Sequence, residues 1–202
     1  EMSASLVGSE MCIRDRRTDM SLEQKKIMVV KIGSSTLVTG EGKLDTAYLA
    51  TLASQISGLR QRGWSPIIVT SGAVACGLEA LGISTRPSDT PSLQAAASVG
   101  TNILVSSYAR AFKAHDMLTS LVLITRQVTA DREQYLHVRD TLERLLDLEV
   151  VPLINENDTV SVDQLCFGDN DTLAALVACL VKAQLCVIFS DCLLYTSPSP
   201  RD

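Results

Sequence analysis

Several common functional signatures are missing from this sequence of 202 residues. No run of lysine or arginine stands out and the formal net charge is -5, so nothing favours electrostatic binding of nucleic acid. The longest uninterrupted apolar run, residues 173–181, is far shorter than the roughly 20 residues that a helix needs to cross a bilayer. No signal-peptide pattern precedes the first predicted strand. These absences predict a protein with no nucleic-acid partner and no membrane segment.

Motifs of several enzyme classes are absent as well. The chain has no GxxxxGK[ST] loop, no GxGxxG turn and no GxSxG elbow, which disfavours P-loop, dinucleotide-binding and α/β-hydrolase sites. The two histidines, His115 and His137, fall on predicted helices, so Ser-His-Asp catalysis is disfavoured too. Six cysteines form no CxxC pair, which indicates a reducing, cytoplasmic environment.

Five apolar segments alternate with amphipathic helical patterns along the chain. Strands separated by helices are typical of an α/β fold with a largely parallel sheet covered on both faces. Periodicity leaves the order of the strands open. The predicted strands are residues 27–32, 66–70, 118–125, 150–154 and 185–189, the predicted helices are 45–62, 72–81, 93–115, 131–147 and 170–182, and a polar hairpin is expected over 159–167.

The two ends of the chain differ from this pattern. Residues 1–17 and 192–202 have neither helical nor strand periodicity, which predicts disordered flanks around one folded segment, residues 18–191. Both flanks also resemble translated sequencing adapter, with MCIRDR near one end and LLYTSPSPRD at the other. We therefore expect both to be non-native.

Two polar clusters stand close together between residues 150 and 171. Asn155 to Asp158 end an apolar strand, and Asp169 and Asn170 open an apolar helix. Ligands of open α/β sheets bind at the carboxyl ends of the strands, and a helix amino terminus offers N–H groups to an anion. A turn and a helix cap use the same residue types. Two such clusters at one edge nevertheless favour a binding site.

Two other strand ends carry polar residues. Lys31 ends a buried strand that has little access to water, and Gly33 and Ser34 follow it, which favours a phosphate ligand. Ser71 and Gly72 follow the second strand and suit hydrogen bonding of a carboxylate or phosphate. The acidic side chains could also hold a hard cation such as Mg²⁺.

Four motifs carry a resemblance to a known family. In this order and spacing, VVKIGSS, IVTSGAVACG, NENDTV and GDNDTLAAL resemble the glutamate 5-kinases of the amino acid kinase family, over about residues 27–191. The resemblance implies a three-layer αβα sandwich with a mainly parallel central sheet. It also implies phosphoryl transfer from ATP, with Mg²⁺, to the side-chain carboxylate of L-glutamate, the first step of proline biosynthesis. Feedback inhibition by proline and a homo-oligomeric full-length protein are implied in the same way.

The resemblance assigns roles to residues in the matching motifs. Lys31 resembles the lysine that neutralises the transferring phosphoryl group, and Asp171 resembles the aspartate that orients it. We therefore expect Lys31 and Asp171 at the same edge of the sheet, within reach of each other or of one bound phosphate. No residue is assigned as a metal ligand. The implied substrate-binding residues are Ser71, Gly72, Asn155, Asp158, Asp169 and Asn170, and the implied nucleotide-binding residues are Lys31, Gly33, Ser34, Ser190 and Asp191.

The chain departs from the family pattern after residue 191. After Ser190 and Asp191 the family has two variable residues and then Gly-Leu-Tyr, whereas this chain has Cys-Leu-Leu-Tyr. The departure predicts a truncated fragment that is inactive alone.

The sequence leaves two alternative functions to weigh. Another amino acid kinase, acting on acetylglutamate or aspartate, is disfavoured by NEND followed by GDND. A non-catalytic amino-acid-binding module would keep Asp158 and Asn170 but would not need Lys31, so ATP binding at Lys31 distinguishes it.

Overall fold

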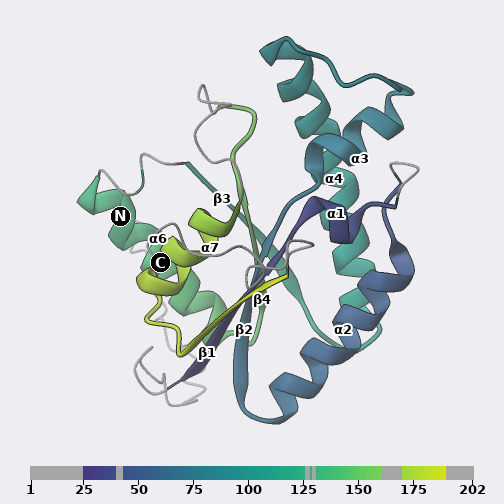
Figure 1. Ribbon diagram of the computed structural model, residues 1–202. Coiled ribbons are helices and arrows are strands. Elements are labelled where there is room, and N and C mark those ends of the chain that lie inside the picture. The colour runs from purple at the N-terminus through teal and green to yellow at the C-terminus, as the bar shows by residue number, and fades with distance from the viewer. Residues whose placement is uncertain (1–24, 40–42, 126–127, 129–130, 161–169, 190–202) are drawn as a thin grey trace, which may run out of the picture.

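The computed structural model describes residues 25–39, 43–125, 128, 131–160 and 170–189. Helices and strands alternate along these residues, as the hydrophobic pattern predicts (Figure 1). No helix in these ranges is long and apolar enough to span a membrane. The elements are β1 (Lys26–Ile32), α1 (Ser34–Leu37), α2 (Thr46–Gln61), β2 (Trp64–Thr70), α3 (Ala73–Ala80), α4 (Thr90–Lys113), β3 (Thr119–Ile124), α6 (Arg132–Asp147), β4 (Val151–Glu156), α7 (Asn170–Leu180) and β5 (Leu185–Phe189).

The five strands form one sheet in the order β3-β4-β2-β1-β5, and every described pairing is parallel. Helices α2 and α4 lie on one side of this sheet and α6 and α7 on the other (Figure 1). The predicted three-layer α/β class is therefore confirmed. All carboxyl ends of the strands meet at one edge, because parallel strands share a direction.

Alternation along β1 divides its side chains between two cores. Met28, Val30 and Ile32 pack in the cluster that includes Leu104 of α4, whereas Ile27 and Val29 pack in the other, with α6 and α7. Lys31 follows the second set in register, so its side chain leaves the strand on the α7 side. The same alternation along β2 puts Ile68 on the α4 side and Val69 on the α7 side.

Side-chain caps explain where two helices begin. The Asp45 carboxylate accepts a hydrogen bond from the Tyr48 N–H at 2.8 Å, as expected for a helix start at this position. Helix α4 begins three residues before the predicted start at residue 93, because Asp89 caps it through Ser92 N at 2.9 Å and Pro91 fits the first turn. The short helix α1 was not predicted. The predicted hairpin over 159–167 falls largely outside the described residues.

Helices α3 and α4 cross at backbone contact. A Cβ atom at Gly77 would lie 1.8 Å from the Ala96 carbonyl oxygen, and one at Gly100 would lie 1.8 Å from the Ala73 carbonyl oxygen. No side chain larger than hydrogen fits at either position. This crossing fixes α3, whose first residue follows the polar end of β2, against the long helix α4.

Candidate functional site

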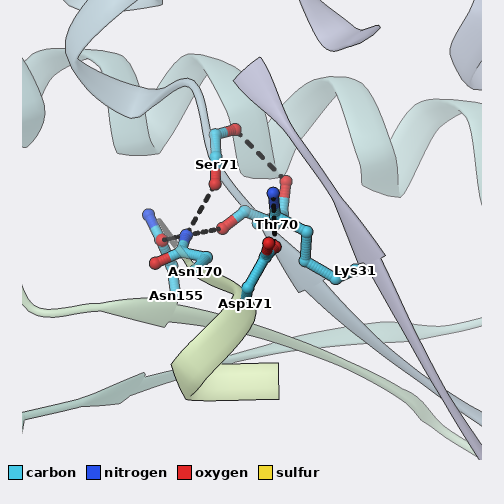
Figure 2. Close-up of polar contacts among 6 residues, drawn as sticks. All are labelled: Lys31, Thr70, Ser71, Asn155, Asn170 and Asp171. Carbon is cyan, nitrogen blue, oxygen red and sulfur yellow. Dashed lines mark hydrogen bonds and ion pairs between the residues drawn. The ribbon is translucent and has the colours of Figure 1, made fainter. Parts of the chain in front are cut away.

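Lys31 and Asp171 form a charge pair at the carboxyl edge of the sheet. The lysine is 2% exposed, and its Nζ lies 2.8 Å from Asp171 Oδ1 in the first turn of α7 (Figure 2). The expected proximity of the two residues is therefore confirmed. Asp171 Oδ1 is buried and accepts no aligned hydrogen bond among the described residues, so attraction to the ammonium is what compensates its burial.

Gly33 brings backbone close to this ammonium group. A Cβ atom built on Gly33 would lie 3.4 Å from Lys31 Nζ and 3.7 Å from the Phe189 carbonyl oxygen at the end of β5. A side chain at this position would occupy the space beside the charge. Glycine at residue 33 therefore keeps the surroundings of the Lys31 ammonium open to a close backbone or ligand approach.

Asn170 joins three segments that are distant in sequence. Its Nδ2 donates to the Thr70 carbonyl oxygen at 2.6 Å, to Ser71 Oγ at 2.7 Å and to Asn155 Oδ1 at 3.0 Å (Figure 2). An amide nitrogen carries two hydrogens, so at least one of them is shared between acceptors. Asn155 is only 3% exposed. The start of α7 is thereby tied to the ends of β2 and β4.

Gly72 turns the chain from β2 into α3. Its φ of +97° lies in the left-handed region, which glycine adopts without steric cost. It occupies the N-cap position of α3, where no side chain caps the first turn. Because the first N–H groups of a helix lack intrahelical partners, this turn can present amides to an anionic ligand.

Asp158 lies half-buried just beyond β4. Burial and the neighbouring Glu156 raise the pKa of the Asp158 carboxyl to about 6, while Arg86 acts in the opposite direction. The ionised carboxylate is thus incompletely compensated by its surroundings. A cationic group placed next to it would lower its pKa and gain binding energy, which suits the ammonium group of an amino acid.

The structure brings together most of the residues that the sequence singles out. Asp169, Ser190 and Asp191 lie outside the described residues, and Ser34 is exposed at the start of α1.

Two residues of the site, Thr70 and Tyr108, were not predicted from the sequence. Thr70 is 1% exposed and Tyr108 is 0% exposed, and their hydroxyl oxygens lie 3.1 Å apart. Their types match ordinary strand and core residues, so no local signal marks them.

The described residues contain no group of three or more His, Cys, Asp or Glu side chains that could hold a metal ion. Magnesium in nucleotide sites is often bound through one or two carboxylates together with the phosphate oxygens. Among the described residues, Asp171, whose side chain is 39% exposed, is a carboxylate beside Lys31 that such an ion could reach. The described residues therefore fit Mg²⁺ that arrives with a nucleotide.

Sequence comparison finds relatives of this chain that have a named enzyme activity. Three relatives named glutamate 5-kinase are similar to this chain. The one from Azoarcus sp. (strain BH72) is 46% identical over 90% of this chain and 49% of the relative, and the one from Desulfitobacterium hafniense (strain Y51) is 46% identical over 81% of this chain and 44% of the relative. The one from Burkholderia ambifaria is 49% identical over 84% of this chain and 46% of the relative. The chain thus spans about half the length of the curated relatives it matches.

Structure comparison supports the fold. A crystal structure of aspartate kinase from Synechocystis superposes with a TM-score of 0.52 at 19% identity, covering 82% of this chain and 28% of that one. At such low identity the likeness concerns the fold alone. The sequence pattern of the amino acid kinase family matches residues 26–199, which include every described strand and helix of the site. With this match, a parallel sheet of the same fold and a lysine charge pair at its carboxyl edge, the chain belongs to the amino acid kinase family.

Proposed function

We propose that the full-length protein transfers the γ-phosphoryl group of ATP to the side-chain carboxylate of L-glutamate, the first step of proline biosynthesis. The observation that carries this proposal is the ion pair of buried Lys31 with the partly exposed Asp171, placed at the same sheet edge as the Asn170 hydrogen-bond network. A buried ammonium supplies positive charge where phosphoryl oxygens need it, and the amides and hydroxyls beside it suit an amino acid. Relatives named glutamate 5-kinase at 46–49% identity support the choice of substrate.

The chemistry requires charge stabilisation and little proton transfer. The glutamate carboxylate is ionised at neutral pH, so its oxygen attacks the γ-phosphorus without a general base, and the bond to the β,γ-bridging oxygen breaks to release ADP. Lys31 neutralises charge on the transferring phosphoryl oxygens, and Asp171 holds its ammonium in place. Mg²⁺ bound with the nucleotide would supply further neutralisation of phosphate charge, and Asp171 is a described carboxylate that would hold it. Positioning of the two reactants accounts for the remainder.

Substrate recognition falls to the other residues of the edge. Asp158 receives the ammonium group of glutamate, since its carboxylate lacks full compensation. The side chains and amides that bind the rest of the amino acid are those of Ser71, Gly72, Asn155, Asp169 and Asn170. The nucleotide phosphates lie against Lys31, Gly33, Ser34, Ser190 and Asp191.

An activity assay of the full-length protein tests this proposal. ADP release is measured with ATP and Mg²⁺ in the presence of L-glutamate, L-aspartate or N-acetyl-L-glutamate, and acyl phosphate is trapped with hydroxylamine. We expect turnover with L-glutamate, with the other two acids at background. Preferred turnover of aspartate or acetylglutamate would assign another amino acid kinase. Glutamate binding with no ATP binding, measured by calorimetry, would instead assign a binding module.

The resemblance to glutamate 5-kinases supports three further proposals, on regulation, assembly and location. We propose that proline inhibits the enzyme, that the full-length protein is a homo-oligomer and that it acts in the cytoplasm. Titration with proline at saturating ATP tests the first point, and light scattering at micromolar concentration tests the second. Fractionation of cells that express the full-length protein tests the third.

A further inference from the structure

A chain of hydroxyl groups reaches the site from the interior of the fold. Tyr108 on α4 is fully buried, and its hydroxyl oxygen lies 3.1 Å from Oγ1 of Thr70, the last residue of β2. Thr70 Oγ1 donates in turn to the Ser71 carbonyl oxygen at 3.3 Å (Figure 2). The alternation along β2 explains the arrangement, because it turns the Thr70 side chain towards α4, where Tyr108 lies.

The number of hydroxyl protons determines which group donates in each of these two hydrogen bonds. A threonine hydroxyl has a single proton, and Thr70 uses it for the Ser71 carbonyl, so Tyr108 has to be the donor in the other contact. Burial raises the pKa of the Tyr108 hydroxyl well above its usual value, so the group keeps its proton. A buried O–H group without an acceptor is costly. The order Tyr108 to Thr70 to Ser71 is therefore the one that satisfies all three groups.

Fixing the Ser71 carbonyl also fixes the amide that follows it. No cis peptide bond occurs among the described residues, so the Ser71–Gly72 peptide is trans and its N–H points opposite to its C=O. The carbonyl is held by Thr70, which directs the Gly72 N–H away from the Thr70 hydroxyl and from Tyr108 behind it. From the other side, Asn170 holds the Thr70 carbonyl and the Ser71 hydroxyl. The turn is thus clamped between α4 and α7.

We propose that Tyr108 is a positioning residue which, through Thr70, fixes the Ser71–Gly72 peptide so that the Gly72 N–H binds a carboxylate of the amino-acid substrate. The inference rests on the function proposed above and deepens it. Tyr108 touches no ligand itself, since it is 0% exposed. It sets the geometry of a group that does.

Four variants of the full-length protein test this role by steady-state kinetics. Tyr108→Phe removes the hydroxyl and keeps the ring, which packs against Phe112 with centroids 5.9 Å apart. Thr70→Val removes the next hydroxyl, Thr70→Ser retains it, and Tyr48→Phe is the matched control, a partly buried tyrosine packed against the same core cluster. We expect Tyr108→Phe and Thr70→Val each to raise the KM for glutamate about tenfold, as expected for one misaligned hydrogen bond to a charged group, with the KM for ATP unchanged. Thr70→Ser and Tyr48→Phe should behave as wild type.

Coupling between the variants separates positioning from general packing. If the two hydroxyls act in series, Tyr108→Phe combined with Thr70→Val is no worse than Thr70→Val alone. Multiplied effects in the double variant, or a Tyr108→Phe protein with a lower Tm and an unchanged KM for glutamate, would overturn the proposal. So would a Thr70→Ser protein as impaired as Thr70→Val.

An NMR measurement on the substrate-free protein tests the positioning role independently of catalytic activity. The backbone amide signal of Gly72 in ¹⁵N-resolved NMR spectra should shift in Tyr108→Phe and Thr70→Val and stay in place in Tyr48→Phe. An unchanged Gly72 signal in Tyr108→Phe would refute the positioning role even in an active enzyme. A wild-type protein that does not phosphorylate glutamate would refute the proposed function, while the Gly72 signal would still report on the hydroxyl chain.

Discussion

The carboxyl edge of the sheet contains two polar regions that are built differently. One is the charge pair of Lys31 and Asp171, in which Nζ and Oδ1 lie 2.8 Å apart. The other is the amide network of Thr70, Ser71, Asn155 and Asn170, in which one nitrogen serves three acceptors. The charge pair places an ion in a site that is 2% exposed, whereas the network contains neutral groups alone.

Because of this difference, we expect the two regions to respond differently when one of their side chains is removed. A buried ion without its partner is strongly destabilising, because the remaining charge stays desolvated. In the neutral network, loss of the donor leaves uncharged acceptors, and their desolvation costs less than that of an ion. We therefore expect the charge pair to control chemistry and stability and the amide network to control the affinity for the amino acid.

The sharpest test of this division is Lys31→Met. The substitution keeps the length of the side chain and removes its charge, so we expect kcat of the full-length enzyme to fall about a thousandfold, with the KM for glutamate changed less than about threefold. Initial rates at saturating ATP measure both constants. Lys26→Met, an exposed position on the same strand, is the control and should leave both unchanged. A variant that keeps its kcat would remove Lys31 from the chemistry.

Asp171→Asn should have the next largest effect, and it acts on stability as well. The amide keeps the shape of the carboxylate but removes the negative charge that lies 2.8 Å from the Lys31 ammonium. Because the Asp171 side chain is 39% exposed and water can reach it, we expect a loss of about 2 kcal/mol in the free energy of unfolding, below the range for fully buried pairs. Urea unfolding measures this loss. Adding Lys31→Met should restore part of it, and a double-variant loss equal to the sum of the two single losses would show that the pair is not coupled.

Asn170→Ala probes the amide network. Removing a donor near the charged substrate should raise the KM for glutamate about tenfold to a hundredfold, with the KM for ATP changed little and the free energy of unfolding lowered less than by Asp171→Asn. Asn102→Ala, an exposed asparagine on α4, is the matched control. An equal rise in both KM values would show that Asn170 maintains the local fold, and the contrast with the charge pair would disappear.

The charge pair shows which features can be predicted from sequence. Lys31 ends an apolar strand and Asp171 opens an apolar helix, and all parallel strands end at the same edge, so their shared edge follows without knowledge of strand order. Their contact was expected from the roles that the family resemblance implies. Ser71 and Asn170 are identified by the same reasoning. Most helices and strands follow from hydrophobic periodicity, although α4 starts earlier than expected because a cap at Asp89 extends it.

The hydroxyl chain shows where sequence reasoning stops. The contact between Tyr108 and Thr70 depends on which helix covers β2, and periodicity gives the inward face of a helix without naming the strand beneath it. The order β3-β4-β2-β1-β5 is likewise set by how the layers fit together. Both features arise from contacts between distant segments, and no local pattern encodes them.

The smallest effect we predict concerns pH, and it involves Asp158, which belongs to neither region. Its carboxyl has a pKa raised to about 6 by burial and by Glu156, so in the free protein it loses its charge as the pH falls through 6. The glutamate ammonium binds the ionised form, which means that affinity is full above this pKa and declines below it. At pH 5 the dissociation constant should be about tenfold higher than at pH 7.

Calorimetric titration of the full-length protein with glutamate between pH 5 and pH 8 measures this decline directly. Asp158→Asn is the informative variant, because it resembles the protonated side chain at every pH. We expect it to bind weakly throughout, with no change across pH 6, whereas Asn170→Ala should bind weakly and keep the wild-type pH dependence. The charge pair should be silent in this experiment, since Lys31 and Asp171 contact the phosphoryl group and not the ammonium. If Lys31→Met abolished the pH dependence and Asp158→Asn retained it, recognition of the amino acid would have to be assigned to the charged pair.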